Sequence, residues 1–480
     1  MLFNSFEFLL FLPTVFLVYW LLSKTRKWQN FFVVVASYVF YGWWDWRFLL
    51  LIVLTSFCSY GSGVLIERYE GRRKAQQMVS AANITLNLLI LCIFKYYNFF
   101  MDNLDALFQS VGYKMDWVTL DIILPVGISF YTFQALSYTI DVYQKKLPAT
   151  HDIMEFFAYI SFFPQLVAGP IERATNLLPQ FQRSRHFDYA KAVDGCRQML
   201  WGFFKKMVIA DNCASIVNEH WNNYGQLPGM TLILLGVLFT FQIYCDFSGY
   251  SDIAIGCARL FGFNLKRNFN VPYFSRSIPE FWRRWHISLM TWFRDYVYFP
   301  LGGSRCSKWK SIRNVYVVWG ISGLWHGANW TFICWGLFHA TLLAIYNILG
   351  INTKYQHVVA YKRWFPSLKE VLQMTLTFAL VVIGLIIFRA ENMTQALDYF
   401  YHMIVNKPLE ISALHGMKYF GFAVAMMFVE WLQRDKEHAL QFTGIWPFRY
   451  RAVRWAVYYL IIMGIVMGSG SGQTFIYFQF

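Results

Sequence analysis

Residues 230–258 read MTLILLGVLFTFQIYCDFSGYSDIAIGCA, an apolar run longer than the roughly 20 residues with which a helix crosses a bilayer. Runs of near-spanning length recur at about 5–23, 29–44, 47–66, 80–100, 120–142, 154–169, 314–346, 370–389, 415–432 and 452–468. Composition agrees, since 57% of the 480 residues are hydrophobic and 14% charged, against roughly 25% charged in soluble domains. The sequence predicts an all-α, polytopic integral membrane protein with roughly 10–12 transmembrane helices, surrounded by membrane lipid.

Helix-breaking residues and charges interrupt some of these runs. Pro125-Val126-Gly127 and the stretch from Pro164 to Pro170 break apolar segments, and residues 195–217 carry Lys205, Lys206 and Asp211 inside an apolar pattern. Broken helices at membrane depth are tolerated only where protein or a water-filled cavity covers the freed backbone. We therefore expect re-entrant and interfacial helices around a central cavity.

The sequence contains no long polar linker, low-complexity tract or internal repeat. We expect one integral domain over residues 1–467, followed by a short tail over residues 468–480. The opening residues lack the positive region and cleavage site of a signal peptide, so the first apolar run is expected to remain as a helix.

The net charge of +15 is distributed as a membrane topology signal and does not indicate nucleic acid binding. Residues 259–313 carry eleven basic and two acidic side chains, which places this segment in the cytoplasm by the positive-inside rule. The N-terminus has Glu7 and no cation before the first span, and the last span follows three arginines. Both chain termini are therefore expected outside the cytoplasmic (inner) membrane.

The same basic segment interleaves its arginines with tryptophan, tyrosine and phenylalanine, and no apolar run within it reaches spanning length. This pattern favours amphipathic helices lying in the cytoplasmic interface. One interpretation is a basic loop that its aromatic side chains anchor. The other is a cytoplasmic mouth for a phosphate-bearing substrate, to which Arg283 and Arg284 offer forked donors.

Two histidines lie in strongly aromatic stretches: His286 in FWRRWHIS (281–288) and His326 in GLWHGANW (323–330). A titratable group at membrane depth is expensive to keep, so its default interpretation is a functional site. The alternative is a histidine that only bonds to a neighbouring helix. Two such histidines in tryptophan-rich frames favour chemistry.

Other polar side chains in apolar runs are expected to be structural. Asp246 and Asp252 flank a Gly-Tyr turn, where we expect them to pair with an arginine or to cap a helix break. The eight cysteines show no Cys-x-x-Cys spacing and fall mostly in apolar runs. They are interpreted as small core residues, so neither disulfides nor a metal site is expected.

Four segments resemble those of membrane-bound O-acyltransferases of the bacterial polysaccharide type, namely GISFYTFQ (127–134), YCDFSGYSD (244–252), FWRRWH (281–286) and GLWHG (323–327). The similarity is close to the branch that O-acetylates alginate, and more distant to the teichoic acid D-alanyltransferases. It runs from about residue 5 to the end of the chain, and the two histidine segments are its most specific part.

The resemblance implies a helical funnel through a locally thinned membrane, with His326 as catalytic base and His286 as the second polar group. The implied donor is a cytoplasmic acyl thioester, expected to be acetyl-CoA, with no permanently bound cofactor. The acyl group would reach an envelope or secreted polysaccharide through an extracytoplasmic partner of the serine-hydrolase type. Neutral imidazole suits removal of a hydroxyl proton, and His286 would orient the thioester or stabilise the oxyanion.

The chain ends in a Gly-Ser stretch, 468–472, followed by QTFIYFQF (473–480). This ending is similar to the C-terminal tyrosine motif of a small membrane partner in teichoic acid D-alanylation, which carries the acyl group as a tyrosyl ester. The resemblance implies that Tyr477 is a transient acyl carrier on a flexible tether. The alternative is an aromatic anchor at the outer interface.

A second functional class is a transporter or channel without acyl-transfer chemistry. Broken helices and polar groups at membrane depth are typical of secondary transporters. Such proteins are built from repeat-related halves, and no repeat is detectable in this sequence. Acyl transfer is therefore the favoured hypothesis.

Overall fold

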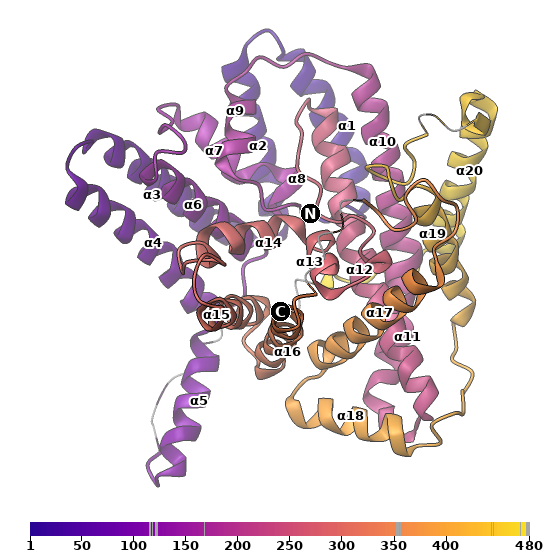
Figure 1. Ribbon diagram of the computed structural model, residues 1–480. Helices are drawn as coiled ribbons and strands as arrows, with labels where there is room; N and C mark the ends of the chain where they lie inside the picture. Colours follow the sequence, from indigo (N-terminus) through magenta and orange to yellow (C-terminus); the bar gives the residue numbers. More distant parts are fainter. Residues whose placement is uncertain are drawn as a thin grey trace. The chain divides into compact units, whose positions relative to one another are not determined.

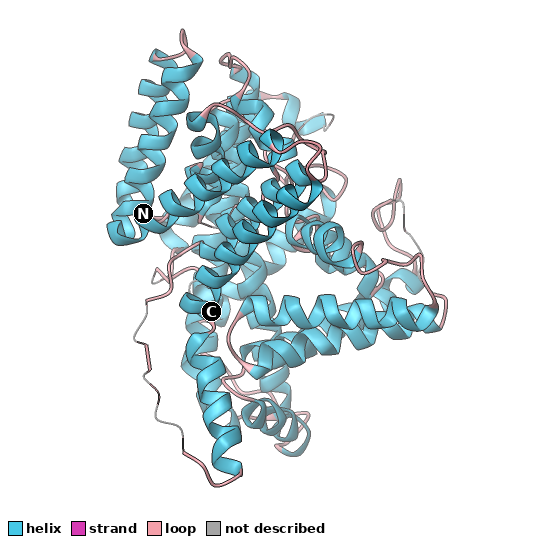
Figure 2. Cartoon of the chain, turned by 90° about the vertical axis from the view of Figure 1, so that its left-hand side faces the viewer, coloured by secondary structure: helices cyan, strands magenta, loops and turns pink. Residues whose placement is uncertain are grey.

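The computed structural model describes residues 1–114, 117, 119–120, 123–167, 169–351, 355, 357–442, 444, 446–470 and 472–476. Throughout these ranges the regular structure is helical, and Figure 2 shows helices joined by loops and turns. The predicted all-α class is confirmed. Tyr477, the predicted acyl carrier, lies outside the described residues.

Six helical segments in the described ranges are long and apolar enough to cross a membrane. They are Arg26–Arg68, Arg73–Lys95, Gly229–Leu260, Trp330–Ile348, Leu368–Arg389 and Arg451–Gly468, and Phe6–Leu21 is a shorter apolar helix. The first of these segments contains two helices joined by a turn, so it corresponds to two of the apolar runs in the sequence. Other runs form shorter helices, as α6 (Ile128–Tyr143) and α19 (Phe420–Leu432) do.

The chain divides into two compact units. The first comprises Met1–Gly195 with Cys257–Lys266, and the second Cys196–Gly256 with Arg267–Phe480. The first contains α1 (Phe6–Leu21), α2 (Arg26–Asp45), η1 (Trp46–Phe48), α3 (Leu49–Arg68), α4 (Arg73–Lys95), α5 (Tyr97–Ser110), α6, α7 (Ile153–Ser161), α8 (Phe163–Leu166) and α9 (Ala174–Phe181). Helices α10 (Tyr189–Phe203) and α12 (Gly229–Leu260) contribute residues to both units.

In the first unit α6 packs against both α3 and α4, and most of its residues are buried. Small polar side chains join these helices, since Asn83 Nδ2 donates to Thr139 Oγ1 at 2.8 Å. The predicted break at Pro125-Val126-Gly127 directly precedes α6. Gly127 has φ +74°, and a Cβ at this position would lie 2.5 Å from the carbonyl oxygen of Leu166. Only glycine fits this turn without strain.

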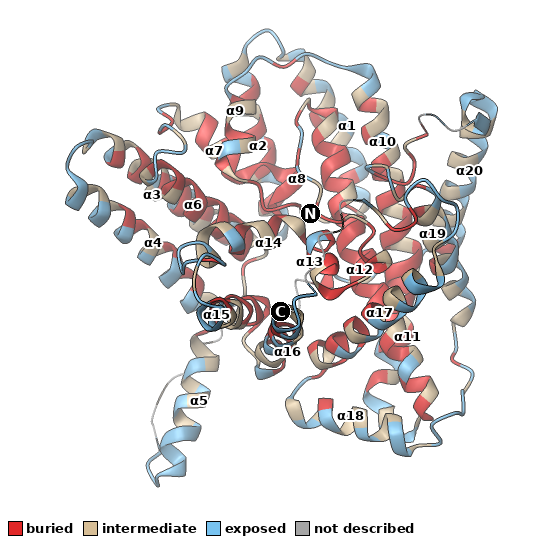
Figure 3. Ribbon diagram, in the orientation of Figure 1, coloured by how far each residue is buried: buried red, intermediate tan, exposed pale blue. Residues whose placement is uncertain are grey.

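The second unit carries the predicted histidines. Its elements are the π-helix η2 (Phe204–Ala210), α11 (Asp211–His220), η3 (Trp221–Gln226), most of α12, η4 (Pro272–Phe274), α13 (Ile278–Arg284), α14 (Ile287–Phe293), η5 (Arg294–Tyr298), α15 (Lys308–His326), α16 (Trp330–Ile348), α17 (Leu368–Arg389), α18 (Met393–Val405), η6 (Met417–Tyr419), α19, η7 (Trp446–Arg449) and α20 (Arg451–Gly468). Helix α12 forms the core of this unit (Figure 3). In its most apolar 18-residue stretch 78% is buried, whereas the corresponding share in α20 is 6%.

Helices α15 and α16 lie side by side as a tight hairpin (Figure 1). Glycines allow the close approach, because a Cβ on Gly323 would lie 2.3 Å from the carbonyl oxygen of Phe332. A Cβ on Gly336 would come equally close to the carbonyl oxygen of Trp319. Small residues at such contacts are typical of helix packing in membranes. The hairpin fixes the position of His326 at its turn.

Residues 195–217, the apolar stretch that carries Lys205, Lys206 and Asp211, lie in a continuous helix with a π-helical turn at its centre. This helix runs from α10 through η2 into α11. It is not among the segments apolar enough to span a membrane. Lys205 and Lys206 are nevertheless buried, with 3% and 1% of their surface exposed. Widened turns of this kind occur frequently at functional sites.

Candidate active site

His326 is the last residue of α15 and is buried among aromatic rings. Its ring centroid lies 4.8 Å from Trp325, 4.9 Å from Trp335 and 5.2 Å from Phe388. The helix ends here because Gly327 takes an extended conformation, and a Cβ on that glycine would collide with the ring of Phe332. The turn between two helices thus presents the imidazole to an apolar interior.

A small apolar cavity borders His326. Its volume is about 10 Å³, and it is lined by Ile243, Phe281, Trp282, Trp285, His326, Trp335, His339, Val381, Leu385 and Phe388. A cavity of this size holds about one water molecule. A ligand that reaches His326 from this side must therefore displace aromatic side chains.

His339 on α16 shares this cavity and was missed by the sequence analysis. Its Nδ1 accepts a hydrogen bond from Trp282 Nε1 at 3.3 Å, so its imidazole proton is carried on Nε2. Gly384 leaves room for the ring, because a Cβ there would lie 2.9 Å from His339 Nε2. The available signal was the four-residue step from Trp335, which places both side chains on one helix face.

His286 joins α13 to α14 in a left-handed conformation, with φ +44° and ψ +52°. This conformation costs a residue other than glycine on the order of 1–3 kcal/mol and occurs preferentially at functional sites. The side chain is 1% exposed, and burial lowers the pKa of His286 to about 3. The imidazole is therefore neutral at physiological pH.

Asn268 determines which nitrogen of His286 carries the proton. The Oδ1 atom of Asn268 accepts from the backbone N–H and the hydroxyl of Ser288, at 3.3 and 3.0 Å. A backbone N–H can only donate, so this atom is the oxygen of the amide. His286 Nδ1 lies 3.1 Å from the same oxygen and must donate to it. In this neutral tautomer Nε2 is a hydrogen-bond acceptor.

The structure brings the two predicted histidines together around Trp325. The ring centroid of Trp325 lies 6.0 Å from that of His286 and 4.8 Å from that of His326. On another side, His286 packs edge-to-face on Phe247 of α12, with centroids 4.6 Å apart. His286 is not among the residues that line the small cavity at His326.

The two arginines predicted to bind the donor have different surroundings. Arg284 is buried and pairs with Glu280 at 2.8 Å, and Arg276 pairs with the same carboxylate at 2.9 Å. Arg283, the preceding residue of α13, is exposed. Donor binding by both residues stays a prediction, and Arg283 is the side chain placed to meet a ligand directly.

The carboxylates of α12 pair with lysines, where an arginine or a helix cap was expected. Lys206 Nζ lies 2.7 Å from Asp246 Oδ1, and Lys205 Nζ lies 2.5 Å from Asp252 Oδ2. The adjacent lysines of η2 thus reach two separate acidic groups. Their structural interpretation is supported, with a partner that the sequence analysis did not name.

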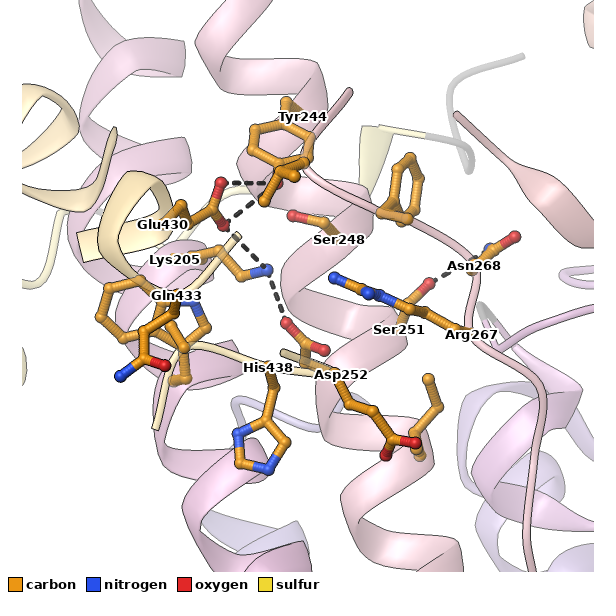
Figure 4. A pocket seen from close by; sticks show the side chains of 16 residues that line it. Lys205, Tyr244, Ser248, Ser251, Asp252, Arg267, Asn268, Glu430, Gln433 and His438 are labelled. Atoms are coloured by element: carbon orange, nitrogen blue, oxygen red, sulfur yellow. Dashed lines mark hydrogen bonds and ion pairs between the residues drawn. The ribbon is translucent and has the colours of Figure 1, made fainter. Parts of the chain in front are cut away.

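Lys205 is one of the residues that line a polar cavity of about 30 Å³ (Figure 4). Tyr244 donates its hydroxyl hydrogen to Glu430, whose carboxylate also lies 4.0 Å from Lys205. Asn268 lines this cavity and also contacts His286. The polar cavity therefore comes within one side chain of the buried histidine.

The described end of the tail lies close to His286. Phe475 and Ile476 have 0% and 2% of their surface exposed. The ring of Phe475 packs on Tyr250 at 4.4 Å and on Phe247 at 5.9 Å between centroids. Because Phe247 also contacts His286, a single ring separates the buried tail from this histidine.

Comparison with known proteins identifies the family. Residues 38–363 match the model of the membrane-bound O-acyltransferase family. The chain is a membrane-bound O-acyltransferase. It is 42% identical to the probable alginate O-acetylase AlgI of Pseudomonas aeruginosa over 434 residues, which cover 90% of this chain and 80% of that protein.

More distant relatives of this membrane-bound O-acyltransferase are named for peptidoglycan and for teichoic acid. The peptidoglycan O-acetyltransferase of Helicobacter pylori is 30% identical over 531 aligned positions, covering 100% of this chain and 98% of that protein. The teichoic acid D-alanyltransferase of Bacillus subtilis is 30% identical over 281, covering 55% and 69%. The four motif segments lie within the matched range, and the chain is a multi-pass membrane protein.

Proposed function

We propose that this enzyme moves an acetyl group from cytoplasmic acetyl-CoA across the inner membrane for O-acylation of an envelope or secreted polysaccharide. The observation that carries the proposal is the grouping of two buried histidines around Trp325, with the C-terminal tail one ring away. The names of the alginate and peptidoglycan relatives support an acetyl group and a polysaccharide acceptor. Charge asymmetry supports termini outside the cytoplasm.

His326 is the general base of the proposed reaction. It takes the proton of the acceptor hydroxyl while the hydroxyl oxygen bonds to the thioester carbonyl carbon. The carbon–sulfur bond then breaks, and the proton passes from the imidazolium to the leaving thiolate. The ester and free coenzyme A thiol are the products, so no co-reactant is consumed.

His286 orients a reactant in this proposal. Because its Nδ1 donates to Asn268, its Nε2 accepts a hydrogen bond and suits an incoming hydroxyl or an amide N–H of the donor. An oxyanion needs a donor instead. The tautomer therefore favours the orienting role over oxyanion stabilisation.

Arg283 meets the phosphates of the donor in this proposal, and Arg284 supports it indirectly by holding Glu280 and hence α13. A guanidinium matches phosphate geometry with two parallel N–H donors. The donor is a substrate that leaves as coenzyme A, so no resident cofactor is required.

Tyr477 is the first acyl acceptor in this proposal. It directly follows the buried Phe475 and Ile476, and its phenol oxygen would receive the acetyl group as a tyrosyl ester. An extracytoplasmic partner of the serine-hydrolase type would then transfer the group to the polysaccharide. The relay allows the enzyme to act without binding the final sugar.

Incubation of the purified protein with acetyl-CoA radiolabelled in the acetyl group tests the function. The expected result is release of coenzyme A thiol together with base-labile label on the protein. Uptake of label into proteoliposomes without thioester cleavage would instead support a transporter. His326→Ala protein is the negative control for both measurements.

A further inference from the structure

The last described residues of the chain are held by a set of backbone contacts. Asn212 Nδ2 donates to the carbonyl of Gly468 at 2.7 Å, and the N–H of Gly470 donates to the carbonyl of Met207 at 3.2 Å. Lys206 Nζ donates to the carbonyl of Gln473 at 3.0 Å. The N–H of Ile476 donates to Asp246 Oδ2 at 2.7 Å.

The glycines of the tail permit this close approach. A Cβ on Gly470 would lie 3.2 Å from backbone atoms of Asp211 and Asn212, and one on Gly468 would lie 3.2 Å from Val208. Sequence reasoning assigned flexibility to the Gly-Ser stretch. In the described residues, these two glycines instead let the tail backbone lie directly against η2 and α11.

Lys206 and its two carboxylates form the charged centre of this contact. Lys206 Nζ lies 2.9 Å from Asp211 Oδ1 and 2.7 Å from Asp246 Oδ1. With the Gln473 carbonyl this makes three partners, as many as the ammonium has N–H donors. Asp246 uses its other oxygen for Ile476. Two tail backbone groups therefore complete a buried ionic triad.

Burial of these three charged side chains costs desolvation free energy, so net stabilisation does not explain them and a positioning role does. The side chains of Lys206, Asp211 and Asp246 are 1%, 3% and 4% exposed. Buried ion pairs contribute little net stability compared with apolar side chains of similar volume, whereas removal of one partner leaves an uncompensated charge. Contacts to backbone groups at two defined positions instead select one register of the tail.

The side chains of the tail show what this register achieves. The ring of Phe475 contacts the rings of Tyr250 and Phe247, and Phe247 also contacts the ring of His286. A one-residue slip would withdraw Phe475 from this aromatic site.

We propose that Lys206 and Asp246 form a tail latch, which seats residues 473–476 in a single register beside the histidine site. Both are positioning residues, because they contact the tail backbone and not the reacting atoms. The presentation of Tyr477 as acyl acceptor rests on the proposed function. The seating of the tail does not, and can be measured without acyl transfer.

Carboxypeptidase trimming of the full-length detergent-solubilised protein, followed by mass spectrometry of its C-terminus, measures the seating. In the wild type, trimming should stop before the buried Ile476. In Asp246→Asn, which weakens the pairing with Lys206, trimming should pass Gln473 at least tenfold faster. Asp252→Asn is the matched control, since it removes the carboxylate that pairs with Lys205, whereas the latch contacts to the tail come from Lys206 and Asp246.

Ile476→Pro tests the same latch from the tail, because proline lacks the N–H that donates to Asp246. Its readout is hydrogen exchange of the Gly470 N–H, which donates to Met207, because carboxypeptidases remove a C-terminal proline poorly. Ile476→Val keeps that N–H and should trim like the wild type. This pair keeps the proposal testable even where Asp246→Asn fails to fold. The latch would be overturned by wild-type protein that is trimmed past Gln473 as fast as Asp246→Asn and exchanges the Gly470 N–H as fast as Ile476→Pro.

Labelling with acetyl-CoA separates the latch from the proposed function. With intact thermal stability and an unchanged KM for acetyl-CoA, Asp246→Asn should label Tyr477 at least tenfold more slowly than the wild type. A protected tail without any label on wild-type Tyr477 would reject the carrier function and leave the seating intact. Equal labelling of wild type, Asp246→Asn and Ile476→Pro would reject the positioning role.

Discussion

His286 Nδ1 donates to Asn268 Oδ1 across 3.1 Å, and this hydrogen bond fixes the tautomer of the buried His286 imidazole. Asn268 is itself held, since its Nδ2 donates to Ser251 Oγ of α12 at 3.2 Å. The orientation of His286 therefore depends on a chain of side chains from α12 to the turn between α13 and α14. Changes at Asn268 should alter the chemistry of His286 without touching a substrate.

Asn268→Asp should make acyl transfer more sensitive to acid than it is in the wild type. The pKa of wild-type His286 is about 3, so its imidazole stays neutral throughout a usual assay range. A carboxylate at position 268 favours the charged imidazolium and raises this pKa. As pH falls through the raised pKa, Nε2 gains a proton and can no longer accept a hydrogen bond. The pH profile of kcat should lose activity on its acidic side, and superimposable profiles would contradict the assignment.

His326→Ala should abolish acyl transfer, because loss of a general base typically lowers the rate by about 10²–10⁴-fold. Expression and thermal stability should stay near those of the wild type. His286→Ala should lower the rate more modestly. His339→Gln, which can still accept from Trp282, is the control within the same cavity and should keep most of the activity. Normal turnover in His326→Ala would remove this residue from the mechanism.

Arg283→Glu should raise the apparent KM for acetyl-CoA several-fold, with an effect that weakens at high salt, since Arg283 is exposed. Arg284→Glu should instead lower the thermal stability. It breaks a buried ion pair, which costs about 3–5 kcal/mol, and sets two carboxylates against each other. Steady-state kinetics and melting curves separate the two effects. An unchanged KM in Arg283→Glu would favour the other interpretation of residues 259–313, a basic loop that its aromatic side chains anchor in the interface.

Tyr477→Phe should lose acyl delivery while it inserts into the membrane normally, because it keeps the ring and lacks only the nucleophilic oxygen. Mass spectrometry of the wild-type C-terminal peptide should find a base-labile acetyl adduct on Tyr477. Wild-type activity in the Phe variant would leave the tail as an aromatic anchor.

Gly127→Ala should destabilise the first unit by about 1–3 kcal/mol, because it strains a left-handed residue and places Cβ 2.5 Å from a backbone oxygen. Gly61→Ala is the matched control on α3, where a Cβ would meet nothing within 4 Å. Thermal melts of the two variants should differ clearly. Equal melting temperatures would show that the turn before α6 adapts without cost.

Much of the fold and part of the site were accessible from the sequence, because the relevant signals are local. An apolar run such as 230–258 predicts a membrane helix by its length alone. The break before α6 follows from the residues Pro125-Val126-Gly127, and the unusual burial cost of a histidine among tryptophans marked His286 and His326. Each of these inferences needs only neighbours within a few positions.

The partners of the buried charges were decided by the tertiary structure. Lys205 and Lys206 are adjacent in sequence, yet they pair with Asp252 and Asp246 because a π-helical turn packs against α12. The tail contact joins Ile476 to a residue 230 positions earlier through its backbone N–H, which every residue except proline carries. Such a contact leaves no side-chain signature in the sequence, and only the packed chain specifies it.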